Sequence, residues 1–189
     1  MKTRFLTTVC ALLTLAVLLG GCSAGAEKAP KKEVGIQLYS VRSLIGAFGN
    51  NQEDYKPVLK QLADMGYTSV EAASYKDGKI YGQTPEQFRK DVEEAGMKVL
   101  STHCTINLSD EELAAGDFSK ALAWWDECIA AHKAAGAEYI VVPSMRKVST
   151  LEELATYCRY FNEIGARCKA AGLKFGYHNH SREFEKIED

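Results

Sequence analysis

Apolar and polar positions along the chain follow two alternating periods, one helical and one of strand type. Four short segments share one form, in which a helical pattern ends at a glycine and strand-forming residues follow: residues 65–72 (MGYTSVEA), 95–102 (AGMKVLST), 135–142 (AGAEYIVV) and 171–178 (AGLKFGYH). A glycine just after the last helical residue fits the left-handed conformation that ends many helices. The segments recur at intervals of roughly 30 to 40 residues, the size of a strand-plus-helix unit. The pattern therefore predicts repeated helix-to-strand units.

The residues before these glycines carry apolar side chains at helical spacing. The four apolar faces are Tyr55, Val58, Leu59, Leu62 and Met65; Phe88, Val92 and Ala95; Leu122, Trp125 and Ile129; and Leu154, Tyr157, Cys158, Phe161, Ile164 and Cys168. Two helix starts, at residues 84–87 (TPEQ) and 150–153 (TLEE), have the sequence of a capping box. We expect four main helices.

A first strand is predicted in residues 34–40 (VGIQLYS), ahead of the first helix. The order is therefore strand then helix, four times, followed by a fifth strand. Such alternation predicts an α/β fold with a parallel sheet and right-handed crossovers. A (β/α)8 TIM barrel and an open doubly wound sheet both satisfy it. Because no G-x-G-x-x-G follows the first strand, we favour a partial TIM barrel with about five strands and four helices.

Polar residues stand near the ends of four predicted strands. They are Gln37, Glu71, His103 and His178, and each alternates with apolar residues that would pack on helices. Tyr39 falls on the same predicted face as Gln37. Catalytic groups of barrels lie at the carboxyl ends of the strands. Together these residues predict a polar pocket, although Glu71 alone could be an inward carboxylate paired with Arg42 or another cation, and His103 a hydrogen-bonded residue near the rim.

His178 and His180 stand two residues apart on the last predicted strand, so both face the barrel interior and could reach one metal ion. The alternative is a hydrogen-bonded pair at a solvated strand end. His132 is expected on the surface of a helix. The pair Trp124 and Trp125 is expected to contribute core and rim rather than a platform for a sugar.

Residues 1–21 have the form of an export signal, with positive charges at the start and an apolar run after them. The run ends in Leu19-Gly20-Gly21-Cys22, which resembles a bacterial lipobox, and we expect Cys22 to be lipidated. The alternative is an ordinary cleaved signal. Residues 22–33 are small, charged and aperiodic, typical of a flexible tether, and residues 34–189 form the domain. These features predict an exported protein anchored by lipid to a bacterial membrane, facing the periplasm or in the outer membrane.

Charge and cysteine usage exclude two classes of function. The net charge is −2, and losing Lys2 and Arg4 with the signal makes the domain more acidic, so a nucleic-acid partner is not expected. The domain keeps Cys104, Cys128, Cys158 and Cys168. No C-x-x-C spacing occurs, so a zinc finger has no support. Export permits disulfides, but we expect buried free thiols.

With these residues in view, the chain resembles the sugar phosphate isomerase/epimerase family, the xylose isomerase-like TIM barrels. The segments that carry the resemblance follow the family's strand order: residues 35–42 (GIQLYSVR), 66–75 (GYTSVEAASY), 80–88 (IYGQTPEQF), 99–104 (VLSTHC) and 176–185 (GYHNHSREFE). The first and last are fairly specific. The resemblance is strongest to exported or lipid-anchored members from bacteria that degrade carbohydrates.

The resemblance implies a barrel that binds one divalent metal ion (Mn, Zn, Co or Mg) and isomerises or epimerises a small sugar. Proton removal beside a carbonyl then gives an enediolate, with Lewis-acid help from the metal. On this basis His178 is expected as a metal ligand, Glu71 and His103 as catalytic residues, and a further set as the lining of the sugar site: Gln37, Tyr39, Tyr81 and His180. Many members carry a Glu where this chain has His178.

The family has eight strands, whereas five are predicted here. The sequence is therefore interpreted as the N-terminal part of such a protein, with the remaining metal ligands expected beyond residue 189 and this chain alone inactive. Alternatives keep the fold but change the role: a dehydratase, a lyase or hydrolase acting on oxidised sugars, or a sugar-binding lipoprotein without catalysis. A relative of the AP endonucleases is disfavoured because the chain is acidic and carries an export signal. The sequence does not predict the oligomeric state.

Overall fold

The computed structural model of the chain describes residues 32–52 and 54–187. Residues from Glu33 onward belong to one compact unit. The predicted signal, the lipidation site Cys22 and most of the tether lie outside the described residues. Within the described part, no helix is both long and apolar enough to cross a membrane.

A parallel sheet of five strands forms the centre of this unit, in the order β1-β4-β7-β8-β9. Its strands are β1 (Gly35–Gln37), β4 (Ser69–Ala72), β7 (Lys98–His103), β8 (Tyr139–Val142) and β9 (Lys174–Tyr177). Each strand pairs only with its neighbours along the chain, as in a barrel wall and unlike a doubly wound sheet, whose order reverses. The predicted α/β class and partial TIM barrel are confirmed.

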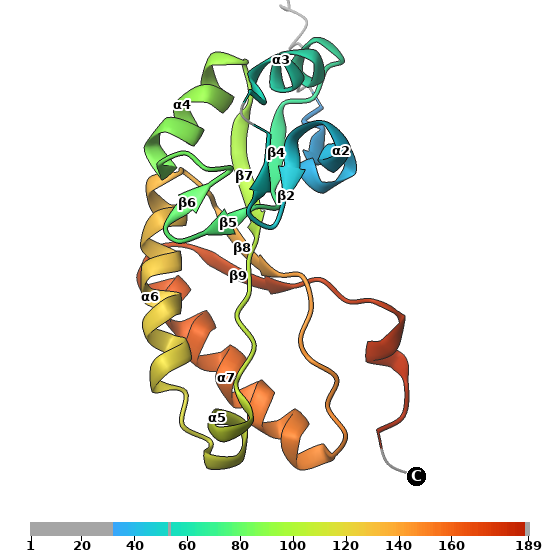
Figure 1. Cartoon of the computed structure of the whole chain (residues 1–189), viewed down its shortest axis with the longest axis vertical. Coiled ribbons are helices and arrows are strands. Elements are labelled where there is room, and N and C mark those ends of the chain that lie inside the picture. Colours follow the sequence, from blue (N-terminus) through green and yellow to red (C-terminus); the bar gives the residue numbers. More distant parts are fainter. Residues whose placement is uncertain (1–31, 53, 188–189) are drawn as a thin grey trace, which may run out of the picture. The chain divides into compact units, whose positions relative to one another are not determined.

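Four main helices connect these strands, as predicted: α3 (Lys56–Asp64), α4 (Pro85–Glu94), α6 (Ser119–Ala134) and α7 (Leu151–Ala170). Figure 1 shows α4, α6 and α7 following one another along the same side of the sheet. The connections hold shorter elements that the pattern did not predict: α2 (Arg42–Ile45), α5 (Asp110–Ala115), the 3-10 turns η1 (Leu38–Val41) and η2 (Ser181–Phe184), and the hairpins β2 (Gly46–Ala47) with β3 (Asn50–Asn51) and β5 (Tyr75–Lys76) with β6 (Lys79–Ile80).

Helix starts form where the sequence places side chains that can accept from free backbone N–H groups. Thr84 accepts a hydrogen bond from the Gln87 N–H at the start of α4, and Thr150 accepts one from the Glu153 N–H at the start of α7. A reciprocal capping box occurs at Ser109, before α5. Such caps each contribute on the order of 1 kcal/mol to helix stability.

The core lies between the sheet and the helices, in two clusters. One gathers under α3 and α4 and includes Leu59, Val70 and Phe88. The other gathers under α6 and α7 and includes Trp125 and Ile164. Strand alternation therefore sends one set of side chains outward into this layer and leaves the opposite set on the inner face of the sheet.

Candidate functional site

The four polar residues predicted at strand ends come from four strands of the sheet. Gln37 ends β1, Glu71 lies in β4, His103 ends β7, and His178 directly follows β9. Gln37 pairs in register with Glu71. The register between β4 and β7 shifts after Val70, so that Glu71 pairs with Ser101. This irregularity keeps Glu71 on the same face as Ser101 and His103, because it skips Leu100.

Three of these side chains form a hydrogen-bonded cluster, here called the polar cluster: Gln37, Glu71 and His103. Glu71 Oε1 accepts from the Gln37 amide at 2.7 Å and lies 3.0 Å from His103 Nε2. The Gln37 Nε2 lies 3.2 Å from each ring nitrogen of His103. Glu71 lies 34 positions and His103 66 positions after Gln37 in the chain, and only the parallel sheet brings them together.

The cluster fixes the charge of Glu71. Partial burial alone would raise the pKa of this carboxyl group, but the hydrogen bonds from His103, Ser101 and Gln37 outweigh that effect and lower its pKa to about 2. Glu71 is therefore a carboxylate at neutral pH. Its partner is not Arg42, as one sequence interpretation had it, since the Arg42 guanidinium lies over the ring of Tyr39, 4.3 Å from its centroid.

The two strand-end histidines extend the polar cluster along the inner face. The ring centroid of His178 lies 5.2 Å from that of His103 and 4.8 Å from that of His180. This supports the prediction that His178 and His180 share the face of the polar cluster. Both are exposed. Imidazole nitrogens beside a carboxylate are donors that suit divalent Mn, Co and Zn.

Two predicted lining residues are not part of the polar cluster. The first strand ends at Gln37 and continues as the turn η1, so strand alternation does not place the side chain of Tyr39. The ring of Tyr39 instead packs near Phe48, with 5.4 Å between centroids.

Tyr81 is 1% exposed, and its ring stacks on Phe88 in the core. Its hydroxyl accepts a hydrogen bond from the Ala73 N–H at 3.3 Å. A side chain so enclosed cannot line an open pocket, so the structure corrects the expectation for Tyr81. The chain turns inward here because Tyr81 follows the β5–β6 hairpin with a left-handed backbone (φ 49°).

The structure adds residues that sequence reasoning did not single out. Ser101 carries a buried hydroxyl on the face of the polar cluster, beside the Glu71 carboxylate. Tyr139 pairs with Ser101 across β7 and β8, and its hydroxyl accepts a hydrogen bond from Lys174 at 2.9 Å. The same strand alternation that selected Glu71 and His103 also marks these positions, but serine and tyrosine alone do not signal chemistry.

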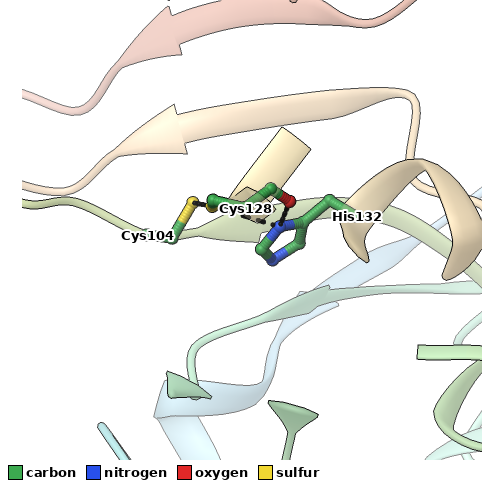
Figure 2. Close-up of side chains that lie close together, drawn as sticks. All are labelled: Cys104, Cys128 and His132. Carbon is green, nitrogen blue, oxygen red and sulfur yellow. Dashed lines mark hydrogen bonds between the residues drawn. The ribbon is translucent and has the colours of Figure 1, made fainter. Parts of the chain in front are cut away.

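A second group lies on the outer face of the sheet, and Figure 2 shows its members pointing toward one another: Cys104, Cys128 and His132. Among the residues that the structure describes, these form the set of three His, Cys, Asp or Glu side chains whose ligand atoms converge, all within 4.8 Å. All three are buried, and His132 is 0% exposed. The expectation that His132 is a surface residue was therefore wrong, because α6 turns this side chain toward the sheet.

Known proteins were compared with the chain at the level of family and of structure. The xylose isomerase-like TIM barrel family matches residues 59–188. A sugar phosphate isomerase/epimerase from Parabacteroides distasonis ATCC 8503 is 26% identical, with a TM-score of 0.68 over 88% of this chain and 57% of that chain. A second structure of this name from the same organism is 30% identical, with a TM-score of 0.70 over 84% of this chain and 58% of that one.

The IOLI protein, whose structure holds a zinc atom, shares the fold at 12% identity, with a TM-score of 0.53 over 77% of this chain and 51% of that chain. No curated protein is significantly similar to the chain. The chain spans less than two thirds of the length of these structures. The family match covers most of the chain, and the sheet has the strand order of a barrel wall. The chain belongs to the xylose isomerase-like TIM barrel family.

Proposed function

We propose that the protein is a sugar isomerase or epimerase that moves a proton beside a carbonyl group through an enediolate. One observation carries the proposal: four strands bring Gln37, Glu71, His103 and His178 to one face at their carboxyl ends. That is the place where barrel enzymes hold their catalytic groups. Two structural neighbours named sugar phosphate isomerase/epimerase support the same class of reaction.

His103 is proposed as the residue that carries the proton. A carboxylate with a pKa of about 2 is a weak base at neutral pH, so Glu71 is poorly matched to proton abstraction by itself. Glu71 is instead placed to orient His103, since it lies 3.0 Å from Nε2 and stabilises the imidazolium that forms when Nδ1 accepts a proton. In the same way, the aspartate of a Ser-His-Asp triad orients the catalytic histidine and stabilises its protonated form.

Gln37 and His180 are proposed to bind sugar hydroxyl groups. The Gln37 amide donates to Glu71 and lies beside both nitrogens of His103, so it fixes the ring where the substrate would contact it. His180 stands beside His178 at the exposed end of the inner face. Rigid polar groups of this kind orient a substrate relative to the proton carrier.

His178 is proposed to hold a divalent metal ion, one of Mn, Zn, Co or Mg. Its imidazole is a suitable donor. Within the described residues, however, the polar cluster does not bring three ligand atoms close enough to one another to hold an ion. Three protein ligands are usual for a catalytic ion. Because the chain spans 57% and 58% of the two matched structures, the proposal assigns the other ligands to later strands. When bound, the ion would supply Lewis-acid polarisation of the substrate carbonyl.

We further propose that the protein is exported and anchored by a lipid on Cys22, with an unphosphorylated sugar as substrate. The supporting observation is the apolar run that ends in Leu19-Gly20-Gly21-Cys22. Sugar phosphates are chiefly cytoplasmic metabolites, which favours a free sugar outside the cytoplasm. Cys22→Ala is expected to release the protein from the membrane fraction, and a variant that stays there would contradict the anchor.

The reaction is tested with the complete gene product that contains this sequence, incubated with a panel of free ketoses and aldoses in D2O. Each of the four divalent ions is added in turn. Proton NMR is expected to show exchange at the carbon beside the carbonyl of one sugar, together with the isomer or epimer as product. His103→Gln is expected to slow both by about 10²- to 10⁴-fold.

Three other outcomes would contradict the proposal. A product that lacks one water would indicate a dehydratase, and a shorter product would indicate a lyase or hydrolase on oxidised sugars. Sugar binding without exchange under any metal condition would indicate a binding protein. Calorimetric titration of the same sugar panel distinguishes the last outcome from a protein that has no sugar site.

A further inference from the structure

We propose that Cys104, Cys128 and His132 form a zinc site between the sheet and helix α6, separate from the polar cluster on the inner face. Cys104 follows the last residue of β7, so it points to the face opposite His103. Cys128 and His132 stand four residues apart on α6 and therefore share one helix face. The site joins a strand end to one turn of the helix that covers it (Figure 2).

The distances are close to those of a tetrahedral zinc site. Zn–S bonds of about 2.3 Å and Zn–N bonds of about 2.0 Å place two sulfurs roughly 3.8 Å apart and a sulfur and a nitrogen roughly 3.5 Å apart. The Cys128 Sγ lies 3.4 Å from His132 Nδ1 and 3.2 Å from the Cys104 Sγ. Binding thus requires the two sulfurs to separate slightly and His132 Nδ1 to leave its 2.7 Å contact with the Cys128 carbonyl oxygen.

Metal binding exchanges one interaction of His132 for another. His132 Nδ1 donates a hydrogen bond to the Cys128 carbonyl oxygen at 2.7 Å, and its Nε2 is buried without a partner. Binding through Nδ1 breaks this hydrogen bond and places the ring proton on Nε2.

Charge balance selects a divalent ion. The two thiols release their protons to solvent, the imidazole proton moves to Nε2, and two thiolates then neutralise Zn²⁺. A monovalent copper ion would leave one negative charge in the core, which is costly without a partner. Thiolate and imidazole donors suit zinc, whereas magnesium and calcium prefer oxygen.

A fourth ligand has space at Cys104. A cavity of about 80 Å³ is lined in part by Cys104, Tyr75 and Trp124, and His103 borders it as well. A water molecule needs only about 30 Å³ of liquid volume. The cavity therefore offers a position for a water ligand and a route for the ion.

A disulfide between Cys104 and Cys128 is the competing outcome. It would require the sulfurs to approach from 3.2 Å to about 2.0 Å, a larger movement than zinc needs and in the opposite direction. It would also leave His132 without a role. Mass spectrometry separates the two outcomes, because a disulfide lowers the mass by two hydrogens and zinc raises it.

The test titrates the full chain, purified under reducing conditions, with Co²⁺ and Zn²⁺. Co²⁺ is expected to give a thiolate-to-cobalt charge-transfer band, which Zn²⁺ removes, and native mass spectrometry is expected to show zinc bound. The polar cluster contains no cysteine, so a metal held there does not produce this band. His178→Ala is therefore expected to leave the band unchanged, which makes the test independent of the proposed sugar reaction.

Matched variants locate the site. Cys104→Ala, Cys128→Ala and His132→Ala are expected to lose the band, whereas Cys158→Ala, at an exposed thiol on α7, is expected to keep it. If core variants unfold, the wild-type titration still decides. The proposal is overturned if the reduced wild-type chain gives no band and binds no zinc. It is also overturned if the unreduced chain has the mass of a Cys104–Cys128 disulfide and reduction does not restore zinc binding.

Discussion

His103 and Cys104 are neighbours in the chain, yet they lie in opposite environments. His103 ends β7 on the inner face, where it contacts Glu71 and Gln37. Cys104 points to the outer face, where it contacts Cys128 beneath α6. One step along a strand reverses the direction of the side chain, so adjacent residues serve the polar cluster and the core. The inner face can hold the polar cluster because the outer face, packed against the helices, forms the core.

The largest expected effect is a difference in stability between variants of the outer and the inner face. Trp125→Ala is expected to lower the free energy of unfolding by about 3–5 kcal/mol, because it empties a core position that is 0% exposed. His178→Ala on the inner face is expected to change it by less than about 0.5 kcal/mol, since His178 is exposed. Urea denaturation of both variants measures the difference. Equal effects would contradict the division of roles between the two faces.

Tyr160→Phe tests the hydrogen bonding of the outer layer. The Tyr160 hydroxyl accepts from the Trp125 indole at 2.7 Å and donates to the Ile106 carbonyl oxygen at 3.1 Å. Its loss leaves a buried indole N–H unpaired, and the expected cost is about 1–3 kcal/mol by chemical denaturation. Tyr139→Phe, on the inner face, is the matched control with a smaller expected cost, because Tyr139 is half-buried. A Tyr160→Phe protein as stable as the wild type would show that the indole finds another acceptor.

Thr150→Ala tests the N-terminal cap of helix α7, which belongs to neither face of the sheet. Thr150 caps α7 by accepting from the Glu153 N–H at 3.1 Å. Its removal is expected to cost about 1 kcal/mol, and Thr150→Ser is expected to restore most of it. Thermal unfolding of the two variants measures the difference. Identical melting of the alanine and serine variants would show that the cap contributes nothing.

Glu71→Gln is expected to change stability in a way that depends on pH. The folded pKa of Glu71 is about 2, below its ordinary value of 4.5, so the carboxylate stabilises the fold above pH 4.5. That stabilisation is lost as the pH falls from 4.5 through about 2. The difference in unfolding midpoint between the wild type and Glu71→Gln is therefore expected to shrink over this range. A difference that stays constant would contradict a charge-dependent role for Glu71.

Much of the fold was predictable because it rests on local patterns. The glycines at 66, 96, 136 and 172 end helices or begin the turns into strands, and all four have positive φ. The alternation in β4 and β7 placed Glu71 and His103 on one face, and the structure joins them through a hydrogen bond. Period and spacing sufficed here because neighbouring parallel strands end at one edge of the sheet.

The rest depended on contacts that spacing does not encode. Strand β1 stops at Gln37, so the alternation used for Tyr39 does not extend to it. The β5–β6 hairpin turns Tyr81 into the core. Histidine is a titratable residue that is common on helix surfaces. Only the packing of α6 against Cys104 reveals that His132 is buried. Cys158 likewise lies exposed, although it was expected with the buried thiols.

The proposed function assigns the transferred proton to His103 and the orientation of its ring to Glu71. The most direct measurement is the rate of proton–deuterium exchange beside the substrate carbonyl, compared between the wild type, His103→Gln and Glu71→Gln in the complete gene product. We predict that both variants lose about 10²-fold or more of the exchange rate, while Cys158→Ser exchanges like the wild type. Exchange that continues at the wild-type rate in His103→Gln would contradict the account.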